Sequence, residues 1–420
     1  MEEQGAFKAP KGTRDLLPPL SWAWEAVVRL AQDTFAQAGY APVETPLFEH
    51  TEVFERGVGE TSEVVNKQMY TFSDLAGRSL TLRPEGTAPV MRAILEHGLD
   101  RGPLPVKLSY ASSMFRQERP QKGRYRQFFQ VGIEAVGSDS PAVDAEVIEV
   151  GVRFLREAGI SPTLLLNSIG HLDESCRIGY LTELRRWLSE HRDELAVEDR
   201  ARIDTNPLRT FDSKNERTQA ALSDAPLISD HLCDPCRKHF DSVLGLLGDL
   251  EISYEIDHRL VRGLDYYTRT AFEFVHGDLG AQNAVGGGGR YDGLAASLGG
   301  RDLPAIGFAL GIDRILLARG EDVDRLATPV EVYVVSLGEE AAKEALKLAT
   351  RLRRAGIGAD LDLAGRAMKG QMKDASRSGA RWAVILGADE LRAGTATLKD
   401  MSSGEQETVP LDAVESRVRA

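Results

Sequence analysis

The chain has 420 residues, long enough for two or three domains that each bury a core, and its 64 acidic residues outnumber its 51 basic ones. A hydrophobic content of 42% with 27% charged residues is typical of a folded globular protein and excludes a disordered or collagen-like chain. Three cysteines are too few for a disulfide framework, and the acidic N-terminus lacks the apolar stretch of a signal peptide or membrane span. We therefore expect a cytoplasmic protein without a membrane partner.

The first predicted elements are a helix and two extended segments. Apolar side chains recur at steps of three and four across residues 21–39, which predicts an amphipathic helix that Ser21 caps and Gly39 ends. Residues 40–50 contain two prolines and are expected to be extended. Residues 79–86 predict a short strand that stops at a proline and a glycine.

The middle of the chain changes from strands to helices. Residues 106–116 and 126–136 have strand patterns and predict a hairpin with a long, charged tip. A helix is expected at 141–158, and residues 170–250 have a mostly polar helical pattern with short breaks, typical of an insertion. Strand patterns return at 254–275.

The last part of the chain predicts a second, smaller domain. The glycines at 286–289 are expected either to form a turn or to let backbone approach a ligand closely, and a strand and a helix follow at 304–318. Residues 321–329 are a plausible linker. Residues 329–420 alternate strands and helices as a small α/β domain with a partly parallel sheet does, and their 14 basic and 14 acidic residues cancel.

Positive charge gathers at the tip of the predicted hairpin. The stretch FRQERPQKGRYRQF, residues 115–128, contains one acid, Glu118, and five cations: Arg116, Arg119, Lys122, Arg124 and Arg126. Strand alternation places these side chains on one face of the second strand: Arg126, Phe128, Gln130, Gly132 and Glu134. Guanidinium groups suit phosphate and an aromatic ring suits a base, so this face is a candidate nucleotide site. The alternative is a solvated hairpin whose arginines only keep it soluble.

Five motifs along the chain resemble those of one enzyme family. MFRQERPQKGRYRQFFQVGIE resembles motif 2 of class II aminoacyl-tRNA synthetases, in the form found in histidyl-tRNA synthetases. RLVRGLDYYTRTAFEF and GGGGRYDGL resemble the two signature motifs of that family, AIGFALGIDRILLA resembles motif 3, and residues 21–46 resemble motif 1. One departure is Asp313 in motif 3, where the family more often has Glu.

The resemblance implies a fold and a domain organisation. We expect an α+β catalytic domain at residues 1–325, built on an antiparallel sheet flanked by helices, with the insertion at about 170–250. A C-terminal α/β anticodon-binding domain is expected at 329–420.

The resemblance also implies an activity and its partners. The family activates L-histidine with ATP to histidyl-adenylate and pyrophosphate, and then transfers histidine to the 3′ end of tRNA(His). ATP enters with Mg²⁺ as a substrate complex, no tightly bound cofactor is expected, and the chain is expected to form a homodimer through motif 1.

Site residues are carried over from the family motif by motif. The expected catalytic residues are Arg262, Arg116 and Gln130. The expected histidine-binding residues are Glu85, Thr87, Gln130, Glu134, Tyr266, Tyr267 and Tyr291. The expected ATP-binding residues are Arg116, Glu118, Arg124, Phe128 and Arg314, and the loop residues Gln121 and Arg126 are expected to approach tRNA. Imidazole offers one donor and one acceptor, which Glu134 and Tyr267 fit; such a site needs no editing domain.

The sequence HLCDPCRKH places Cys233 and Cys236 in C-x-x-C spacing. A structural zinc site normally takes four ligands from two separated pairs, and Cys176 is the one other thiol. His231 and His239 lie close in sequence. The expectation is a helix start within the insertion and no metal site.

Two other functions fit parts of this pattern. A catalytically inert synthetase paralogue that acts as a regulatory subunit in histidine biosynthesis resembles the catalytic domain, but such proteins lack the C-terminal domain and have eroded motifs. A synthetase for another amino acid is disfavoured by RGLDYY together with Glu134.

Overall fold

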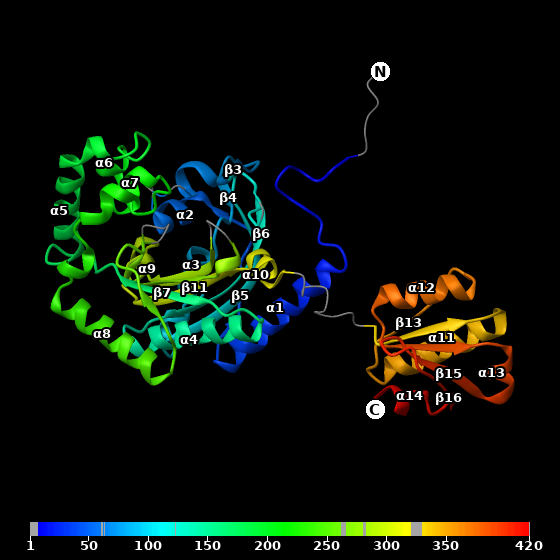
Figure 1. Ribbon diagram of the computed structural model, residues 1–420. Coiled ribbons are helices and arrows are strands. Elements are labelled where there is room, and N and C mark those ends of the chain that lie inside the picture. Colours follow the sequence, from blue (N-terminus) through cyan, green and yellow to red (C-terminus); the bar gives the residue numbers. More distant parts are fainter. Residues whose placement is uncertain are drawn as a thin grey trace, which may run out of the picture. The chain divides into compact units, whose positions relative to one another are not determined.

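The computed structural model describes residues 7–59, 62, 64–121, 123–261, 266–279, 283–320 and 330–419. The described chain forms two compact units: residues 7–17 and 24–320 belong to the larger one, and residues 18–23 and 330–419 to the smaller one. Figure 1 shows both units, each built from helices packed on a sheet. No helix in the described part of the chain has the length and apolar character needed to cross a bilayer.

An eight-stranded sheet forms the centre of the larger unit. Its strand order is β1 (Ala41–Pro42), β5 (Val106–Phe115), β6 (Gln127–Val136), β11 (Ala305–Gly311), β10 (Ala284–Arg290), β9 (Thr268–Val275), β7 (Thr163–Ser168) and β8 (Glu255–Ile256). The six central strands pair antiparallel, and only the short edge strands β1 and β8 pair parallel with their neighbours. The predicted fold class, an antiparallel sheet flanked by helices, is confirmed.

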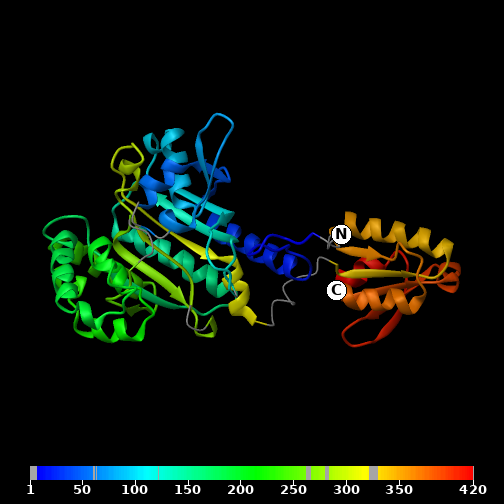
Figure 2. The same ribbon diagram turned by 90° about the horizontal axis from the view of Figure 1, so that it is seen from above.

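Helices cover the sheet on both faces (Figures 1 and 2). One face carries α1 (Leu20–Gln37), α4 (Pro141–Glu157) and α8 (Asp234–Asp249), where Phe35 of α1 lies edge-on to Phe154 of α4 and Phe308 of β11. Above the other face lie α2 (Thr51–Val58), α3 (Thr87–Glu96) and α9 (Leu294–Ser297), and α10 (Ile312–Arg319) follows β11. A small second sheet has the order β2 (Phe48–His50), β4 (Ser79–Leu82) and β3 (Tyr70–Ser73).

The helices between β7 and β8 have a core of their own, as the predicted insertion requires. They are α5 (Arg177–Glu190), α6 (Arg202–Thr205), α7 (Glu216–Ala221) and α8. Leu184, Leu188 and Leu222 are fully buried among them. In Figure 1 the helices α5, α6 and α7 lie together at one side of the larger unit.

The smaller unit is an α/β sandwich with a partly parallel sheet, as predicted. Its strand order is β13 (Ala359–Leu361), β12 (Val332–Ser336), β14 (Trp382–Leu386), β15 (Thr395–Asp400) and β16 (Gln406–Pro410). β12 pairs parallel with β13 and β14, and the other two pairings are antiparallel. The accompanying helices are α11 (Glu339–Arg354), α12 (Met368–Ser378), α13 (Ala388–Ala393) and α14 (Val414–Arg419).

Several local predictions need correction. Helix α1 begins at Leu20, so Ser21 lies inside the helix and does not cap it. Of the two alternatives for the glycines at 286–289, the turn is excluded, because they lie in strand β10. Strand β7 was missed because a short, continuous apolar run has no alternation to distinguish it from a buried helix. The predicted linker at 321–329 lies outside the described residues.

Candidate active site

A cavity of about 380 Å³ lies in the larger unit, over the centre of its sheet. Strands β5, β6, β9, β10 and β11 and the start of α3 contribute to its wall. Most of the residues that the sequence predicted for the site line this cavity: Glu85, Thr87, Arg116, Glu118, Arg124, Phe128, Gln130, Tyr266, Tyr267, Tyr291 and Arg314. Side chains spread over some 230 positions of the sequence are therefore gathered by the sheet.

The β5–β6 hairpin forms one side of the cavity. Its register pairs Ser112 with Gln130 and Tyr110 with Gly132, which confirms the predicted hairpin. Gln130 and Phe128 line the cavity as alternation predicts. The carboxamide oxygen of Gln130 is buried and has no hydrogen-bond partner among the described residues. Such an orphaned acceptor is costly unless a ligand satisfies it.

Arg126 leaves the face on which alternation had placed it. It lies one residue before β6 begins, and its side chain donates to the carbonyl oxygens of Glu118 (3.3 Å) and Lys11 (3.4 Å). Gln121 forms a tight turn with Arg124, in which each backbone N–H donates to the other residue's carbonyl. Neither Arg126 nor Gln121 is among the lining residues of the cavity.

Arginine side chains contribute positive charge to the cavity wall. The Nε of Arg116 donates to the carbonyl of Pro84 at 2.9 Å, and its guanidinium carbon lies 5.2 Å from the centre of the Phe128 ring. Burial lowers the pKa of Arg116.

Two further arginines, Arg124 and Arg314, line the cavity. Burial and the nearby charge of Arg124 lower the pKa of Arg314. Arg124 forms an ion pair with Glu118 at 3.4 Å, and Arg314 donates to the carbonyl of Ala284. Two guanidinium groups that repel each other beside one cavity are stabilised when an anion enters between them.

Two buried carboxyl groups, Glu85 and Glu134, lie at or behind the cavity wall. Glu85 is 4% exposed and caps α3, because its two oxygens accept from the backbone N–H groups of Thr87 (2.8 Å) and Ala88 (2.9 Å). The pKa of Glu85 is raised by burial, against the pull of these N–H groups. Glu85 was expected at this site from the family motif, but its contact with the helix start was not foreseen.

Glu134 lies directly behind the lining, not on it. Its oxygens accept hydrogen bonds from Thr87 (2.8 Å), Tyr110 (3.4 Å) and Tyr291, and these three residues do line the cavity. Burial raises the pKa of Glu134 to about 8, although the hydrogen bonds oppose the rise. Gly307 makes room for this carboxylate, since a Cβ there would lie 1.9 Å from Oε2 of Glu134.

Three tyrosines pack together beside these carboxyl groups. The ring of Tyr266 lies 4.8 Å from that of Tyr267 and 5.6 Å from that of Tyr291, and its hydroxyl lies 3.5 Å from Glu85. Burial is the main cause that raises the pKa of Tyr266 and of Tyr291. These hydroxyls therefore stay protonated and can donate hydrogen bonds.

Some lining residues were not predicted. Arg209 comes from the insertion, in a short 3₁₀ turn at Pro207–Thr210, and Glu273 comes from β9. Tyr125 is held by Arg14, which donates to its hydroxyl at 2.9 Å. No local pattern distinguishes these residues, because only the tertiary fold brings them to the cavity. The expected catalytic residue Arg262, and Lys122 of the basic loop, lie outside the described residues.

Comparisons with known proteins agree with this geometry. The family described as "Histidyl-tRNA synthetase" matches residues 12–315, and "Anticodon binding domain" matches residues 331–420. The chain belongs to the histidyl-tRNA synthetase family. It is 51% identical to the histidine–tRNA ligase of Corynebacterium kroppenstedtii, over 98% of this chain and 97% of that one. It is 48% identical to the histidine–tRNA ligase of Halothermothrix orenii, over 96% and 97% of the two chains. The solved histidyl-tRNA synthetase of S. aureus, without ligand, superposes with a TM-score of 0.79 at 36% identity, covering 99% of this chain and 100% of that one.

Membership of this family identifies the activity. The chain is a class II ligase that activates histidine with ATP and transfers it to tRNA, and the smaller unit is its anticodon-binding domain. The matches to histidyl-tRNA synthetases and ligases extend over nearly the whole length of both units, which disfavours the regulatory paralogue.

Proposed function

We propose that histidine and ATP react in the cavity over the sheet, with histidine at the end that holds Glu85 and Glu134 and the phosphates at the arginine end. The single observation that carries this assignment is the composition of one cavity wall, which combines a buried carboxyl group and tyrosine hydroxyls with four arginines. An amino acid and a nucleotide need both kinds of group close together, because the histidine carboxylate must reach the α-phosphate.

The first step forms a bond between the histidine carboxylate oxygen and the α-phosphorus of ATP and breaks the bond to the β-phosphate, releasing pyrophosphate. In the second step a terminal ribose hydroxyl of tRNA attacks the histidyl carbonyl, loses its proton, and AMP leaves. Positioning and fixed charge supply most of the catalysis in such steps. We assign the α-phosphate to Arg116 and, from its motif, to Arg262, and we expect the orphaned oxygen of Gln130 to contact the substrate.

The histidine end offers groups that match each part of the amino acid. Glu85 and Thr87 suit the α-ammonium group, and Tyr266 lies within reach of the same carboxylate. Glu134 and Tyr267 are assigned to the two imidazole nitrogens, and Tyr291 holds Glu134 in place. A site with paired polar groups rejects analogues that leave those groups unsatisfied.

The nucleotide end offers a ring and paired charges. We assign the adenine to Phe128, under the guanidinium of Arg116, and the outer phosphates to Arg124 and Arg314. The carboxylates of Glu118 and Glu273 also line the cavity. Oxygen ligands are what Mg²⁺ prefers, so these two residues fit the ion that accompanies ATP and would neutralise phosphate charge.

We propose that tRNA(His) meets two separate surfaces. Gln121 and Arg126, in the loop between β5 and β6, approach the acceptor end, and the smaller unit, charge-balanced within an acidic chain, contacts the anticodon. None of the three cysteines forms a disulfide, which suits catalysis in the reducing cytoplasm.

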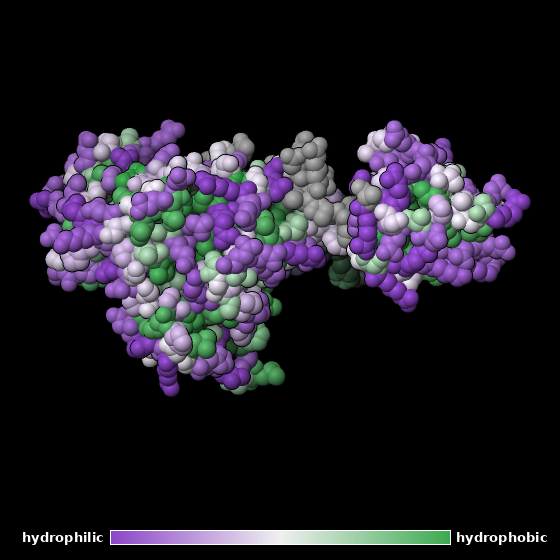
Figure 3. Space-filling view, turned by 90° about the horizontal axis from the view of Figure 1, so that it is seen from below, coloured by the Kyte–Doolittle hydropathy of each residue, from purple (hydrophilic) through white to green (hydrophobic). Residues whose placement is uncertain are grey.

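A homodimer is also part of this proposal. The β2–β4–β3 sheet exposes Phe48 (50%) and Phe72 (44%), whose rings lie 6.2 Å apart, and Leu47, the residue before β2, is 49% exposed. Figure 3 shows hydrophobic atoms on the lobe that carries this sheet, at the bottom of the view. Exposed aromatics grouped on one surface are typical of an interface.

The test is ATP–pyrophosphate exchange with each of the twenty amino acids, repeated with Arg314→Ala. We expect exchange with histidine alone, and a loss of roughly 10²-fold in kcat/KM for ATP in the variant, because one charge-stabilising donor is removed. Arg156→Ala, at an exposed position of α4, is the matched control. Exchange with a different amino acid refutes the assignment of the histidine end. An Arg314 variant that is fully active refutes its phosphate role.

A further inference from the structure

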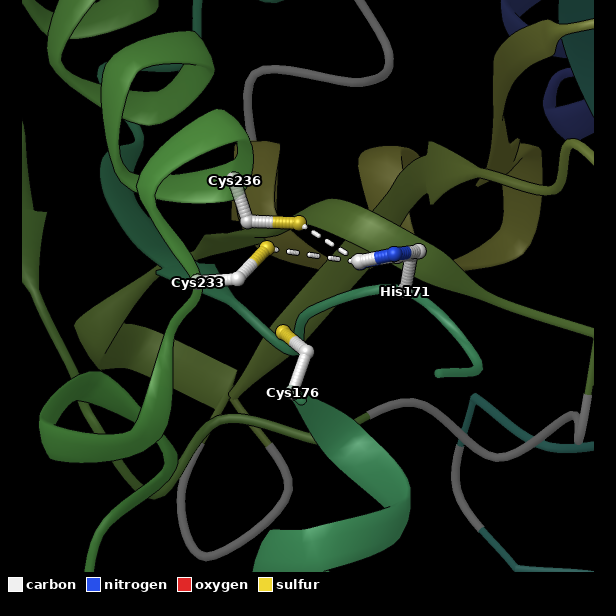
Figure 4. A group of neighbouring side chains, drawn as sticks. All are labelled: His171, Cys176, Cys233 and Cys236. Atoms are coloured by element: carbon white, nitrogen blue, oxygen red, sulfur yellow. Dashed lines mark hydrogen bonds between the residues drawn. The ribbon is translucent and has the colours of Figure 1, made fainter. Parts of the chain in front are cut away.

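The three cysteines of the chain and His171 meet at one point (Figure 4). Their ligand atoms, the sulfurs of Cys176, Cys233 and Cys236 and a ring nitrogen of His171, all lie within 4.8 Å of one another. Nδ1 of His171 lies 3.1 Å from Sγ of Cys236 and 3.6 Å from Sγ of Cys233. The cluster is separate from the cavity, because none of its members lines it.

The local fold builds this cluster from two short segments. His171 lies in the loop after β7, and Cys176 is the residue before α5. Cys233 is the residue before α8, and Cys236 lies in the first turn of that helix, so the predicted helix start is confirmed. The left-handed Gly170 (φ +63°) permits the close approach, since a Cβ there would lie 2.7 Å from Sγ of Cys176.

We propose that His171, Cys176, Cys233 and Cys236 bind one zinc ion as a tetrahedral structural site. The donor set is three sulfurs and one imidazole from two pairs separated in sequence, which is the usual composition of a closed zinc site. The sequence alone predicted no metal here, because the second pair is not a C-x-x-C and is distant along the chain.

Burial favours a metal over a surface cluster of thiols. Cys176 and Cys236 are each 1% exposed and belong to the core of the insertion. Soft thiolate and imidazole ligands select zinc over magnesium or calcium.

The two histidines nearest to the C-x-x-C in sequence have other partners. Nε2 of His231 lies 3.6 Å from a carboxylate oxygen of Glu183, and Nε2 of His239 lies 2.9 Å from Asp144. The histidine of the cluster is His171, which lies 65 residues from Cys236 in sequence.

The location gives the ion a structural role. It ties the first residues of the insertion to its last helix, and closing a long loop in this way stabilises the folded chain. Arg177, next to Cys176, donates to the backbone carbonyl of Tyr267 at 2.5 Å. A zinc ion would therefore also hold the start of α5 against a strand end that lines the active site.

The experiment measures metal in the full-length protein purified under reducing conditions without chelators. We expect about one zinc ion per chain in the parent and less than about one tenth of that in Cys233→Ser, whose side chain is the least buried of the three thiols. The control is His191→Gln, a histidine of the insertion that stacks on Trp187 and is not part of the cluster. It should retain the ion.

Two further measurements separate zinc binding from other uses of the thiols. Replacing zinc by Co²⁺ should give the visible absorption of a tetrahedral cobalt site with a thiolate charge-transfer band, lost in Cys233→Ser. Removing the ion with a chelator should lower the Tm of the parent and leave that of Cys233→Ser unchanged. Absence of stoichiometric metal together with no cobalt spectrum overturns the proposal, and so does a disulfide between two of these cysteines found by mass in the freshly purified protein. None of these readouts depends on aminoacylation.

Discussion

At the scale of single residues, the carboxyl groups assigned to the substrate also accept hydrogen bonds from neighbouring residues. Glu85 caps a helix with both oxygens, and Glu134 accepts three hydrogen bonds from residues of the cavity wall. These contacts hold each carboxyl group in place without an ion pair. The consequence is a pair of buried acids whose ionised form is poorly stabilised, so the pKa of each is raised.

The raised pKa of Glu134 predicts that the stability of the protein depends on pH. Its pKa is raised from an ordinary value of 4.5 to about 8, so the folded protein holds a proton that the unfolded chain releases between these values. The free energy of unfolding without ligand must therefore fall as pH rises through this window. Glu134→Gln removes that titration, so its Tm should fall less than that of the parent between about pH 5 and pH 8.

The control for Glu134→Gln is the same substitution at an exposed glutamate. Glu190→Gln, at the exposed end of α5, should follow the parent at each pH. If the parent and Glu134→Gln lose stability in parallel over this range, the carboxyl group of Glu134 is not the one that takes up the proton.

The sequence predicted site residues well where strand alternation or a motif fixed them. Phe128 and Gln130 follow from alternation along one strand, and Tyr266 and Tyr267 from a motif. Arg126 was misplaced because alternation was extended one residue beyond the strand. Arg209 could not be predicted, because its approach depends on how the insertion packs on the sheet.

At the scale of elements, the hairpin was the most predictable part and the glycine-rich strand the least. Strands β5 and β6 end within one residue of their predicted limits, since their alternation and charged loop are both local signals. Strand β10 contains four consecutive glycines, and its strand character comes only from hydrogen bonds to β9 and β11. Low β propensity was overridden by tertiary contacts.

The glycines of these central strands predict a sharp difference between two alanine substitutions. In Gly307→Ala the new Cβ would overlap Oε2 of Glu134 and lie 2.3 Å from the carbonyl of Ile133, so the carboxylate must move. We expect at least a roughly tenfold rise in KM for histidine and a lower Tm, because overpacking a core costs about 1–3 kcal/mol.

Gly293→Ala is the matched control, since nothing lies within 4 Å of a Cβ there and its φ of −86° suits any residue. It should leave both values close to those of the parent. Pyrophosphate exchange and thermal unfolding measure the two effects. An unchanged KM for histidine in Gly307→Ala would show that Glu134 can shift without loss, which removes its assigned role at the imidazole.

At the scale of the whole molecule, composition predicted the class of protein, and motifs predicted the family. Alternating elements were enough to predict an α/β unit after residue 329, because its strands are short, apolar and separated by amphipathic helices. Neither source could predict the cluster of His171 with three cysteines, since its two halves are joined only by the folded insertion. Local sequence patterns do not show which distant residues come into contact.

The assembly of two chains gives the last prediction. If the surface of Phe48 and Phe72 forms an interface with two-fold symmetry, each substitution acts twice in the dimer. An aromatic at the centre of an interface contributes about 2 kcal/mol or more, so Phe48→Asp should cost about 4 kcal/mol per dimer, which corresponds to a rise in Kd of roughly 10³-fold. Light scattering at micromolar concentration should give about twice 46.0 kDa for the parent and a mass near 46.0 kDa for the variant.

Leu250→Asp is the control for a new charge at an equally exposed apolar position, because Leu250 is 49% exposed at the end of α8. It should remain dimeric. Circular dichroism must first show that both variants are folded, since β2 pairs with β4 next to the cavity-forming segment of Glu85. A folded Phe48→Asp that stays dimeric at every concentration would place the interface elsewhere, and a monomeric parent would rule out the dimer altogether. If Phe48→Asp is a folded monomer, its rate of adenylate formation shows, as a direct measurement on the variant, whether one chain is sufficient for the first step.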